Sequence, residues 1–250
     1  MLKDEEKRAS SVYIILILAI LGSAVGSFLN VCISRIPEGA SLIFPSSHCP
    51  KCKKKLLFFD LIPIISYFLL SGKCRYCGKK ISVRYPVVEA ITAFVFIMSY
   101  IKYRMSIDLL FFLVIASLLI IISFIDLEHM VIPDFLMIIG IFLGLIYSLY
   151  SGNMIDALKG ISVGFVFMYL LGLSAKYLFK KEALGEGDIK LVVMLSSFLG
   201  VERTFISIFS GSIIGSVIAG MLMLAGRLKR QDYIPFGPFL SLGALIVMLL

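Results

Sequence analysis

Charged side chains are scarce in this chain of 250 residues. Only 16% of the residues are Asp, Glu, Lys or Arg, whereas 60% are hydrophobic and the mean hydropathy is +1.01. A water-soluble domain of this length needs far more polar residues to cover its surface. The scarcity of charge therefore excludes an ordinary soluble globular protein and indicates an integral membrane protein.

The apolar residues gather in long runs. Runs of roughly 17–25 such residues are typical of membrane-spanning helices. The first run is too long for a signal-peptide core and lacks an Ala-x-Ala cleavage site, so we expect it to remain as a helix. The predicted fold class is an all-α polytopic membrane protein with about eight transmembrane helices, at 12–33, 85–101, 107–125, 131–150, 157–179, 188–201, 204–226 and 234–250.

Glycines recur four residues apart within several of these runs. Small residues at that spacing let two helix backbones approach closely, which predicts tight helix–helix packing. The pairs are Gly22/Gly26, Gly140/Gly144, Gly160/Gly164 and Gly211/Gly215.

Lys and Arg indicate the orientation of the spans. The loop at 34–84 and the loops that eight alternating spans place on its side, together with the nearby span ends, carry 17 of the 24 basic residues. The positive-inside rule therefore predicts that this side is cytoplasmic and that the N-terminus is outside. We therefore attribute the net charge of +8 to the basic residues that set the topology. The sequence contains no motif for binding nucleic acid.

Four of the five cysteines form two pairs, Cys49-Pro-Lys-Cys52 and Cys74-Arg-Tyr-Cys77, with 21 residues between them. Two such turns can complete a tetrahedral thiolate site, which predicts structural zinc. Two disulfides are the alternative, but a cytoplasmic loop is reducing. Cys32 lies in the first span, where we expect a small buried apolar residue.

An apolar stretch separates the two cysteine pairs. If Leu56–Leu70 crossed the bilayer, the pairs would lie on opposite sides and could not share an ion. The stretch is also short, and Asp60 and Pro63 interrupt it. It is therefore predicted to be a core-packed or interfacial segment rather than a span.

Carboxylates at the ends of spans indicate a functional site, because they are costly there. Asp126 ends the third span, and Asp188 opens the sixth within Gly185-Glu-Gly-Asp188. Two carboxylates sharing a site hold one proton between them, so one can activate water while the other donates to a carbonyl oxygen. This pair predicts peptide hydrolysis without a metal, with Gly185 and Gly187 shaping the site.

The other polar residues beside Asp126 receive simpler interpretations. Asp134 follows Pro133 at the start of the fourth span, where an Asp commonly caps a helix. Glu128 and His129 are expected in a solvated turn. Pro133 is expected to help shape the active site.

Taken together, the ordered motifs resemble one known family, the type IV prepilin peptidases (leader peptidase/N-methyltransferases), which are intramembrane aspartyl proteases of the Gly-x-Gly-Asp type. The resemblance covers essentially the whole chain after residue 20. Its motifs are Gly26–Pro37, the four-cysteine loop with Asp60–Ser66, Arg84–Glu89, Asp126–Asp134, Ala183–Leu191 and Ile234–Phe239.

The resemblance implies cleavage of prepilins and pseudopilins of type IV pilus and secretion systems after a short basic leader, at the bacterial inner membrane. It implies that Asp126 and Asp188 are catalytic. It also implies methylation of the new N-terminus by S-adenosyl-L-methionine, associated with residues 1–101 and the cysteine loop, whereas 102–250 would be the six-helix peptidase domain. The residues themselves do not reveal a methyl-donor site.

Three other classes of protein share part of this pattern. A presenilin-like protease shares Gly-x-Gly-Asp but should carry Pro-Ala-Leu where this chain reads Ile234-Pro-Phe-Gly-Pro. An ion-coupled transporter could use the two aspartates as a relay, but the chain shows no two-fold internal repeat. A zinc-bearing membrane scaffold would leave the two aspartates unexplained.

Overall fold

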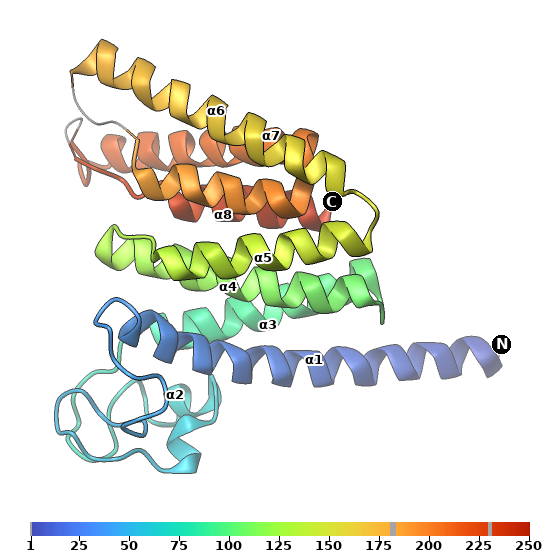
Figure 1. Cartoon of the computed structure of the whole chain (residues 1–250). Coiled ribbons are helices and arrows are strands. Elements are labelled where there is room, and N and C mark those ends of the chain that lie inside the picture. Colours follow the sequence, from blue (N-terminus) through green and yellow to red (C-terminus); the bar gives the residue numbers. More distant parts are fainter. Residues whose placement is uncertain (1, 181–183, 230–231) are drawn as a thin grey trace. The chain divides into compact units, whose positions relative to one another are not determined.

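The structure, a computed structural model, describes residues 2–180, 184–229 and 232–250, and within these ranges every regular element is a helix (Figure 1). The all-α fold class is confirmed. Parts of the predicted loops at 180–187 and 227–233, and Ala183 of one motif, lie outside the described residues. The helices are α1 Leu2–Arg35, a 3-10 helix Phe58–Leu61, α2 Ile65–Leu69, α3 Arg84–Tyr103, α4 Ile107–His129, α5 Asp134–Tyr150, α6 Met154–Phe179, α7 Glu186–Leu224 and α8 Gly237–Leu249.

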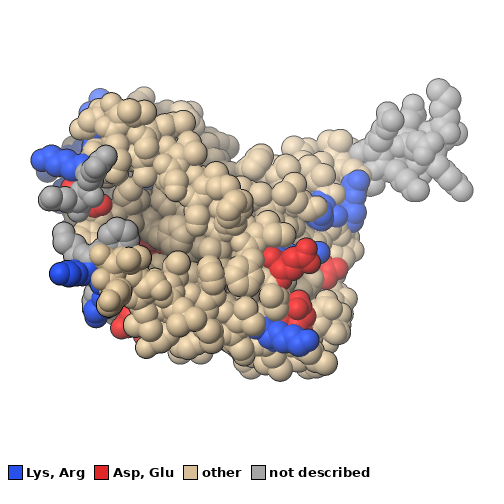
Figure 2. Space-filling view, turned by 90° about the horizontal axis from the view of Figure 1, so that it is seen from above, with Lys and Arg blue, Asp and Glu red and all other residues tan. Residues whose placement is uncertain are grey.

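Among the described residues, five helical stretches are long and apolar enough to cross a membrane: Ser11–Arg35, Arg84–Tyr103, Ile107–His129, Met154–Leu178 and Glu186–Leu224. Helices α5 and α8 are apolar but shorter. On the face drawn in Figure 2, most of the surface carries no charged side chain. The chain is a multi-pass membrane protein.

Helix α7 is interrupted at Gly200, whose backbone has φ 74° and ψ −169°. Gly164 of α6 lies against Ser196, before the interruption, while Phe167 of α6 contacts Phe205, after it. Both halves of α7 therefore run along the same part of α6, and the chain reverses direction at Gly200. The two predicted spans at 188–201 and 204–226 correspond to these halves.

The chain divides into two compact units, Met1–Ser117 and Leu118–Leu250. In the first, α1 and α3 run antiparallel, because Gly22 lies against Ala93 and Gly26 against Glu89. A Cβ added to either glycine would lie 2.7 Å from the opposing backbone Cα. The predicted close packing at this pair is confirmed.

The second unit contains the other three glycine pairs, and each lies against a neighbouring helix. Gly140 and Gly144 of α5 contact Met194 and Ser197 of α7. A bond of 2.7 Å from the Ser148 hydroxyl to the Ser197 carbonyl also joins these two helices. The remaining contacts are Gly160 with Gly200, Gly164 with Ser196, and Gly211 and Gly215 with Phe239 of α8.

Several predicted span ends differ from the observed helix ends by a few residues. Helix α4 continues to His129 rather than ending at 125, because polar residues can extend a helix past the apolar run, and the backbone N–H of Met130 still donates to the Asp126 carbonyl at 2.9 Å. Helix α5 begins at Asp134 rather than at 131. The stretch Leu56–Leu70 is not a span: it contains only the 3-10 helix and the five-residue α2.

Candidate active site and cysteine cluster

Asp126 lies in the last turn of α4 and is only 6% exposed. One of its carboxylate oxygens, Oδ2, accepts a hydrogen bond of 3.0 Å from the backbone N–H of Gly237, the first residue of α8. A Cβ on Gly237 would lie 2.7 Å from that oxygen. The absence of a side chain at Gly237 thus lets the backbone donate directly to a buried carboxylate.

Asp188 lies in the first turn of α7 and is 9% exposed. Gly185 is the N-cap of the helix, and its carbonyl accepts the backbone N–H of Asp188 at 3.1 Å. A Cβ on Gly185 would lie 3.3 Å from Asp188 Oδ2. A carboxylate in this first turn also lies at the positive end of the helix dipole.

The two carboxylates belong to one site within the second unit. Ile132, in the link between α4 and α5, lies against Gly187 beside Asp188 and against Gly237 beside Asp126. The two acids are also close enough for the charge of Asp126 to act on Asp188. Four parts of the chain therefore converge: the end of α4, the link after it, the start of α7 and the start of α8.

Two residues of this site were missed by the sequence interpretation. Gly237 contributes its backbone N–H, and Ile132 contributes an apolar side chain packed between Gly187 and Gly237. Neither residue has a titratable side chain, so neither was recognised as a candidate. The signal for Gly237 was present in the motif Ile234–Phe239, which was quoted but not connected with Asp126. Pro133, predicted to shape the site, is the N-cap of α5 and directly follows Ile132.

The capping role predicted for Asp134 is wrong. The N-cap of α5 makes no side-chain capping bond, and Asp134 Oδ1 instead accepts a bond of 2.7 Å from Lys190 Nζ. This exposed ion pair joins the start of α5 to the first turns of α7. Glu128 and His129 lie in the last turn of α4 rather than in a loop, and both are exposed.

The four paired cysteines come together in the first unit. Their Sγ atoms all lie within 4.8 Å of one another, and those of Cys49 and Cys77 are 3.9 Å apart. Four thiolates at about 2.3 Å from a tetrahedral zinc ion are about 3.8 Å from each other. All the cysteines are free, so the alternative of two disulfides does not describe this structure.

Each cysteine pair lies in its own tight turn. Isolated antiparallel bridges join His48 to Lys55 and Lys73 to Lys80 around the two turns. The backbone N–H of Cys49 donates to the Lys54 carbonyl, and that of Cys74 to the Lys79 carbonyl. The two pairs are thus presented in similar local structures.

The surroundings favour a charged sulfur in the cluster. Backbone N–H donation from Cys52, with smaller contributions from Lys51 and neighbouring thiols, lowers the pKa of the Cys49 thiol to about 6. Donation from the Lys79 N–H also lowers the pKa of Cys77, but desolvation and the neighbouring sulfurs outweigh it and raise that pKa to about 11. The lowered pKa of Cys49 fits a cluster that could hold a metal ion, which would take all four sulfurs as thiolates.

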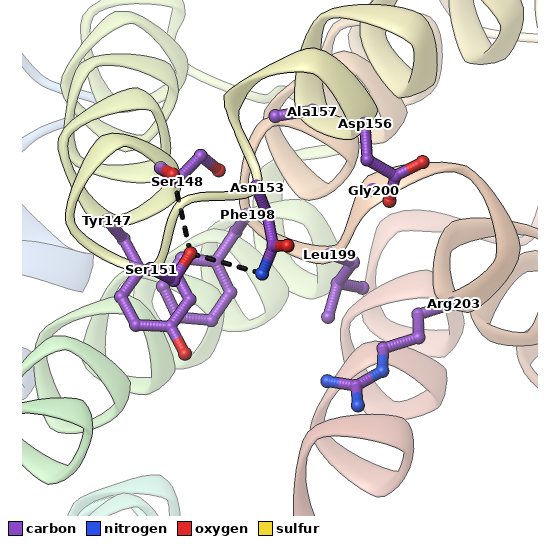
Figure 3. Close-up of a pocket in the computed structure, with 10 residues that line it drawn as sticks. All are labelled: Tyr147, Ser148, Ser151, Asn153, Asp156, Ala157, Phe198, Leu199, Gly200 and Arg203. Atoms are coloured by element: carbon purple, nitrogen blue, oxygen red, sulfur yellow. Dashed lines mark hydrogen bonds between the residues drawn. The ribbon is translucent and has the colours of Figure 1, made fainter.

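A polar cavity of about 230 Å³ lies at the reversal of α7, well away from the carboxylates. Figure 3 shows Asp156 beside Gly200, with Arg203 and Asn153 around the same space. A Cβ on Gly200 would collide with the Asp156 carboxylate. Asp188 is twelve residues from Gly200, or about 18 Å along the helix, so this cavity is not part of the carboxylate site.

The fold and the site define a class: a multi-pass helical membrane protein with two buried carboxylates at helix ends and a four-cysteine cluster. Comparison with known families agrees with this class. Residues 20–103 match the bacterial peptidase A24 N-terminal domain, and residues 113–220 match the type IV leader peptidase family. The chain belongs to the type IV leader peptidase family.

Curated relatives cover most of the chain. A prepilin leader peptidase/N-methyltransferase of Neisseria gonorrhoeae is 34% identical over 92% of this chain and 88% of its own length. One of Bacillus subtilis is 33% identical over 93% of both chains. One of Myxococcus xanthus is 38% identical over 83% of this chain, which spans 63% of that relative. No solved structure matches the chain.

Proposed function

We propose that this protein is a membrane-embedded aspartyl endopeptidase that removes short basic leader peptides from type IV prepilins and pseudopilins. The observation that carries the proposal is the convergence of Asp126 and Asp188 in one buried site. The names of the relatives, prepilin leader peptidase/N-methyltransferase, give the substrate class. Membership in the family also argues against the presenilin-like, transporter and scaffold alternatives.

In this proposal the two carboxylates share one proton. The ionised member takes a proton from a water molecule, which attacks the scissile carbonyl carbon, while the protonated member donates to the carbonyl oxygen. Collapse of the tetrahedral intermediate expels the amine, which receives a proton from the pair. The Gly237 N–H bond orients Asp126, and Gly185 and Gly187 leave room beside Asp188 for an extended substrate strand.

The same protein is proposed to methylate the new N-terminal amine with S-adenosyl-L-methionine. This activity rests on the names of the relatives and is assigned to residues 1–101, with the peptidase in residues 102–250. Cys49, Cys52, Cys74 and Cys77 are proposed to hold one structural zinc ion, because four sulfurs leave it no open position for chemistry. Their mutual spacing supports this assignment.

The proposed location is the bacterial inner membrane. With spans that alternate across the bilayer, the distribution of Lys and Arg favours an outside N-terminus and a cytoplasmic position for the cysteine loop and both aspartates. A substrate with a basic leader would keep that leader in the cytoplasm by the same rule, which brings its cleavage site to this face.

Mass spectrometry of a prepilin-like peptide tests both activities. Detergent-solubilised protein is incubated with the peptide, with and without S-adenosyl-L-methionine. We expect loss of the leader in both samples. Only in the sample with S-adenosyl-L-methionine should the mature peptide gain about 14 Da, the mass that one methyl group adds when it replaces a hydrogen. An uncleaved peptide with folded protein would contradict the peptidase proposal, whereas cleavage without methylation would contradict only the methyltransferase proposal.

A further inference from the structure

The apolar segment of the cysteine loop, residues 57–69, exposes its hydrophobic side chains. Within it Leu57, Phe58, Phe59, Leu61, Ile65, Phe68 and Leu69 are 39–79% exposed. Its one carboxylate, by contrast, is engaged. Asp60 accepts a bond of 2.7 Å from Arg75, and the side chain of Asp60 is only 2% exposed.

This arrangement is held from two directions. On one side, Asp60 ties the segment to the second cysteine turn through Arg75 and accepts the backbone N–H of Leu57 at 3.2 Å. Burial alone would raise the pKa of the Asp60 carboxyl, but these bonds outweigh it and lower that pKa, so the ion pair persists at neutral pH. On the other side, the buried Glu89 of α3 accepts the backbone N–H of Ile64 at 2.7 Å.

Ile64 lies in a conformation that a β-branched residue rarely adopts. Its φ is 62° and its ψ is −53°, and the N–H of Ile65 bonds the Pro63 carbonyl across it, which is a strained γ-turn. Such a conformation persists only where the surroundings impose it. The bond to Glu89 holds the backbone at this turn, which lies between the 3-10 helix and α2.

The bond to Glu89 also shows which turn of α3 the segment lies beside. Glu89 lies five residues beyond Arg84, the first residue of α3, which is about 7.5 Å along the helix axis. The segment is therefore held level with the second turn of α3, near one end of this apolar helix, which is where an interfacial segment would lie.

The charges around the segment select the kind of membrane surface. Lys51, Lys53, Lys54, Lys55, Lys73, Lys79 and Lys80 of the same loop are all exposed. The only acids in residues 34–84 are Glu38 and Asp60, and Asp60 is paired with Arg75. Exposed apolar side chains next to a lysine-rich surface complement anionic phospholipids, since each lysine near such a surface adds to binding.

We propose that residues 57–69 are an interfacial anchor, embedded in the headgroup region of the bilayer that the protein spans, with the loop lysines on anionic phospholipid headgroups. The anchor would hold the cysteine cluster at the membrane surface. A partner with a positively charged surface fits poorly, because the seven lysines would repel it. This inference goes beyond the proposed peptidase and methyltransferase activities and does not depend on them.

Single-tryptophan reporters test the anchor. The chain contains no tryptophan, so the full-length variants Phe68→Trp and Phe59→Trp each carry one fluorophore in the segment. Ser46→Trp, at an exposed position of the same loop outside the segment, is the matched control. Each variant is placed in nanodiscs whose phospholipids carry brominated acyl chains, which quench tryptophan on contact.

We expect the two segment variants to lose a large part of their fluorescence and the control to lose little. The loss should be larger in phosphatidylglycerol than in phosphatidylcholine, and high salt should reduce this difference. Fluorescence of both segment variants unaffected by brominated lipid would overturn the anchor: red-shifted emission would then show exposure to water, and blue-shifted emission would show cover by polypeptide. Equal quenching in the two lipids would overturn the role of the lysines.

Discussion

Asp126 and Asp188 lie in the terminal turns of long helices, whereas the four clustered cysteines lie in turns outside any helix. The carboxylates are positioned by helices whose glycines allow close backbone contact. The cysteines are positioned by short bridges, by the Asp60–Arg75 pair and, in our proposal, by zinc. The helical site should therefore be sensitive to added volume, and the cysteine site to the loss of a ligand.

The largest effect of added volume is expected at Gly237. In Gly237→Ala the new Cβ would lie 2.7 Å from Asp126 Oδ2 and 3.2 Å from Ile132, so the carboxylate must move. A displacement of about 1 Å costs about 100-fold in rate, which is the fall in prepilin cleavage that we expect. The control is Gly220→Ala in the second half of α7, where the Cβ meets nothing within 4 Å. Equal cleavage by the two variants would show that the Gly237 contact is unimportant.

Loss of a sulfur ligand should affect the first unit instead. For Cys74→Ser we expect bound zinc to fall from about one per chain to a small fraction, because structural zinc needs all four ligands. Methylation should fall before cleavage does. Metal analysis and the peptide assay measure the two effects, with Cys32→Ala, a cysteine outside the cluster, as the control. Zinc retained by Cys74→Ser, or equally lost by Cys32→Ala, would count against the assignment.

Added volume farther from the carboxylates should affect stability more than rate. In Gly144→Ala the Cβ would clash with the Ser197 hydroxyl on α7, so helices α5 and α7 must separate. Overpacking of this kind costs about 1–3 kcal/mol. Thermal unfolding in detergent should show a lower midpoint for Gly144→Ala than for Gly220→Ala. A midpoint as high as that of the control would mean that the two helices adjust at no cost.

The smallest effect is expected for the ion pair between Asp134 and Lys190. The side chain of Asp134 is 67% exposed and that of Lys190 is 45% exposed. Pairs this exposed contribute at most about 1 kcal/mol, so Asp134→Asn should keep most of its stability and cleavage activity. The peptide assay and thermal unfolding check this, and complete loss of cleavage would assign Asp134 a direct part in the reaction.

The features that depend on side-chain type and spacing could be predicted from the sequence. Apolar runs gave the spans, the cysteine spacing gave the cluster, and Gly-x-Gly-Asp with Asp126 gave the two carboxylates that the structure brings together. The helix boundary at His129 was missed because polarity rises there while backbone bonding continues. Whether the two aspartates catalyse cleavage stays a prediction.

Other features depend on contacts between residues far apart in the chain. The N–H of Gly237 meets Asp126 across 111 residues of sequence, and a backbone donor has no titratable side chain that would connect its motif with Asp126. The partner of Asp134, Lys190, lies 56 residues away, so the local pattern after Pro133 favoured capping. The γ-turn at Ile64 depends on Glu89, on another helix.

The central claim is that Asp126 and Asp188 together cleave the substrate, and the variants Asp126→Asn and Asp188→Asn test it most directly. Asn keeps the shape of Asp but cannot exchange the proton that hydrolysis requires. With folding confirmed by thermal unfolding, mass spectrometry of the prepilin-like peptide should show cleavage abolished in each variant, while a peptide supplied already cleaved is still methylated. Substantial leader removal by either folded variant would contradict the account.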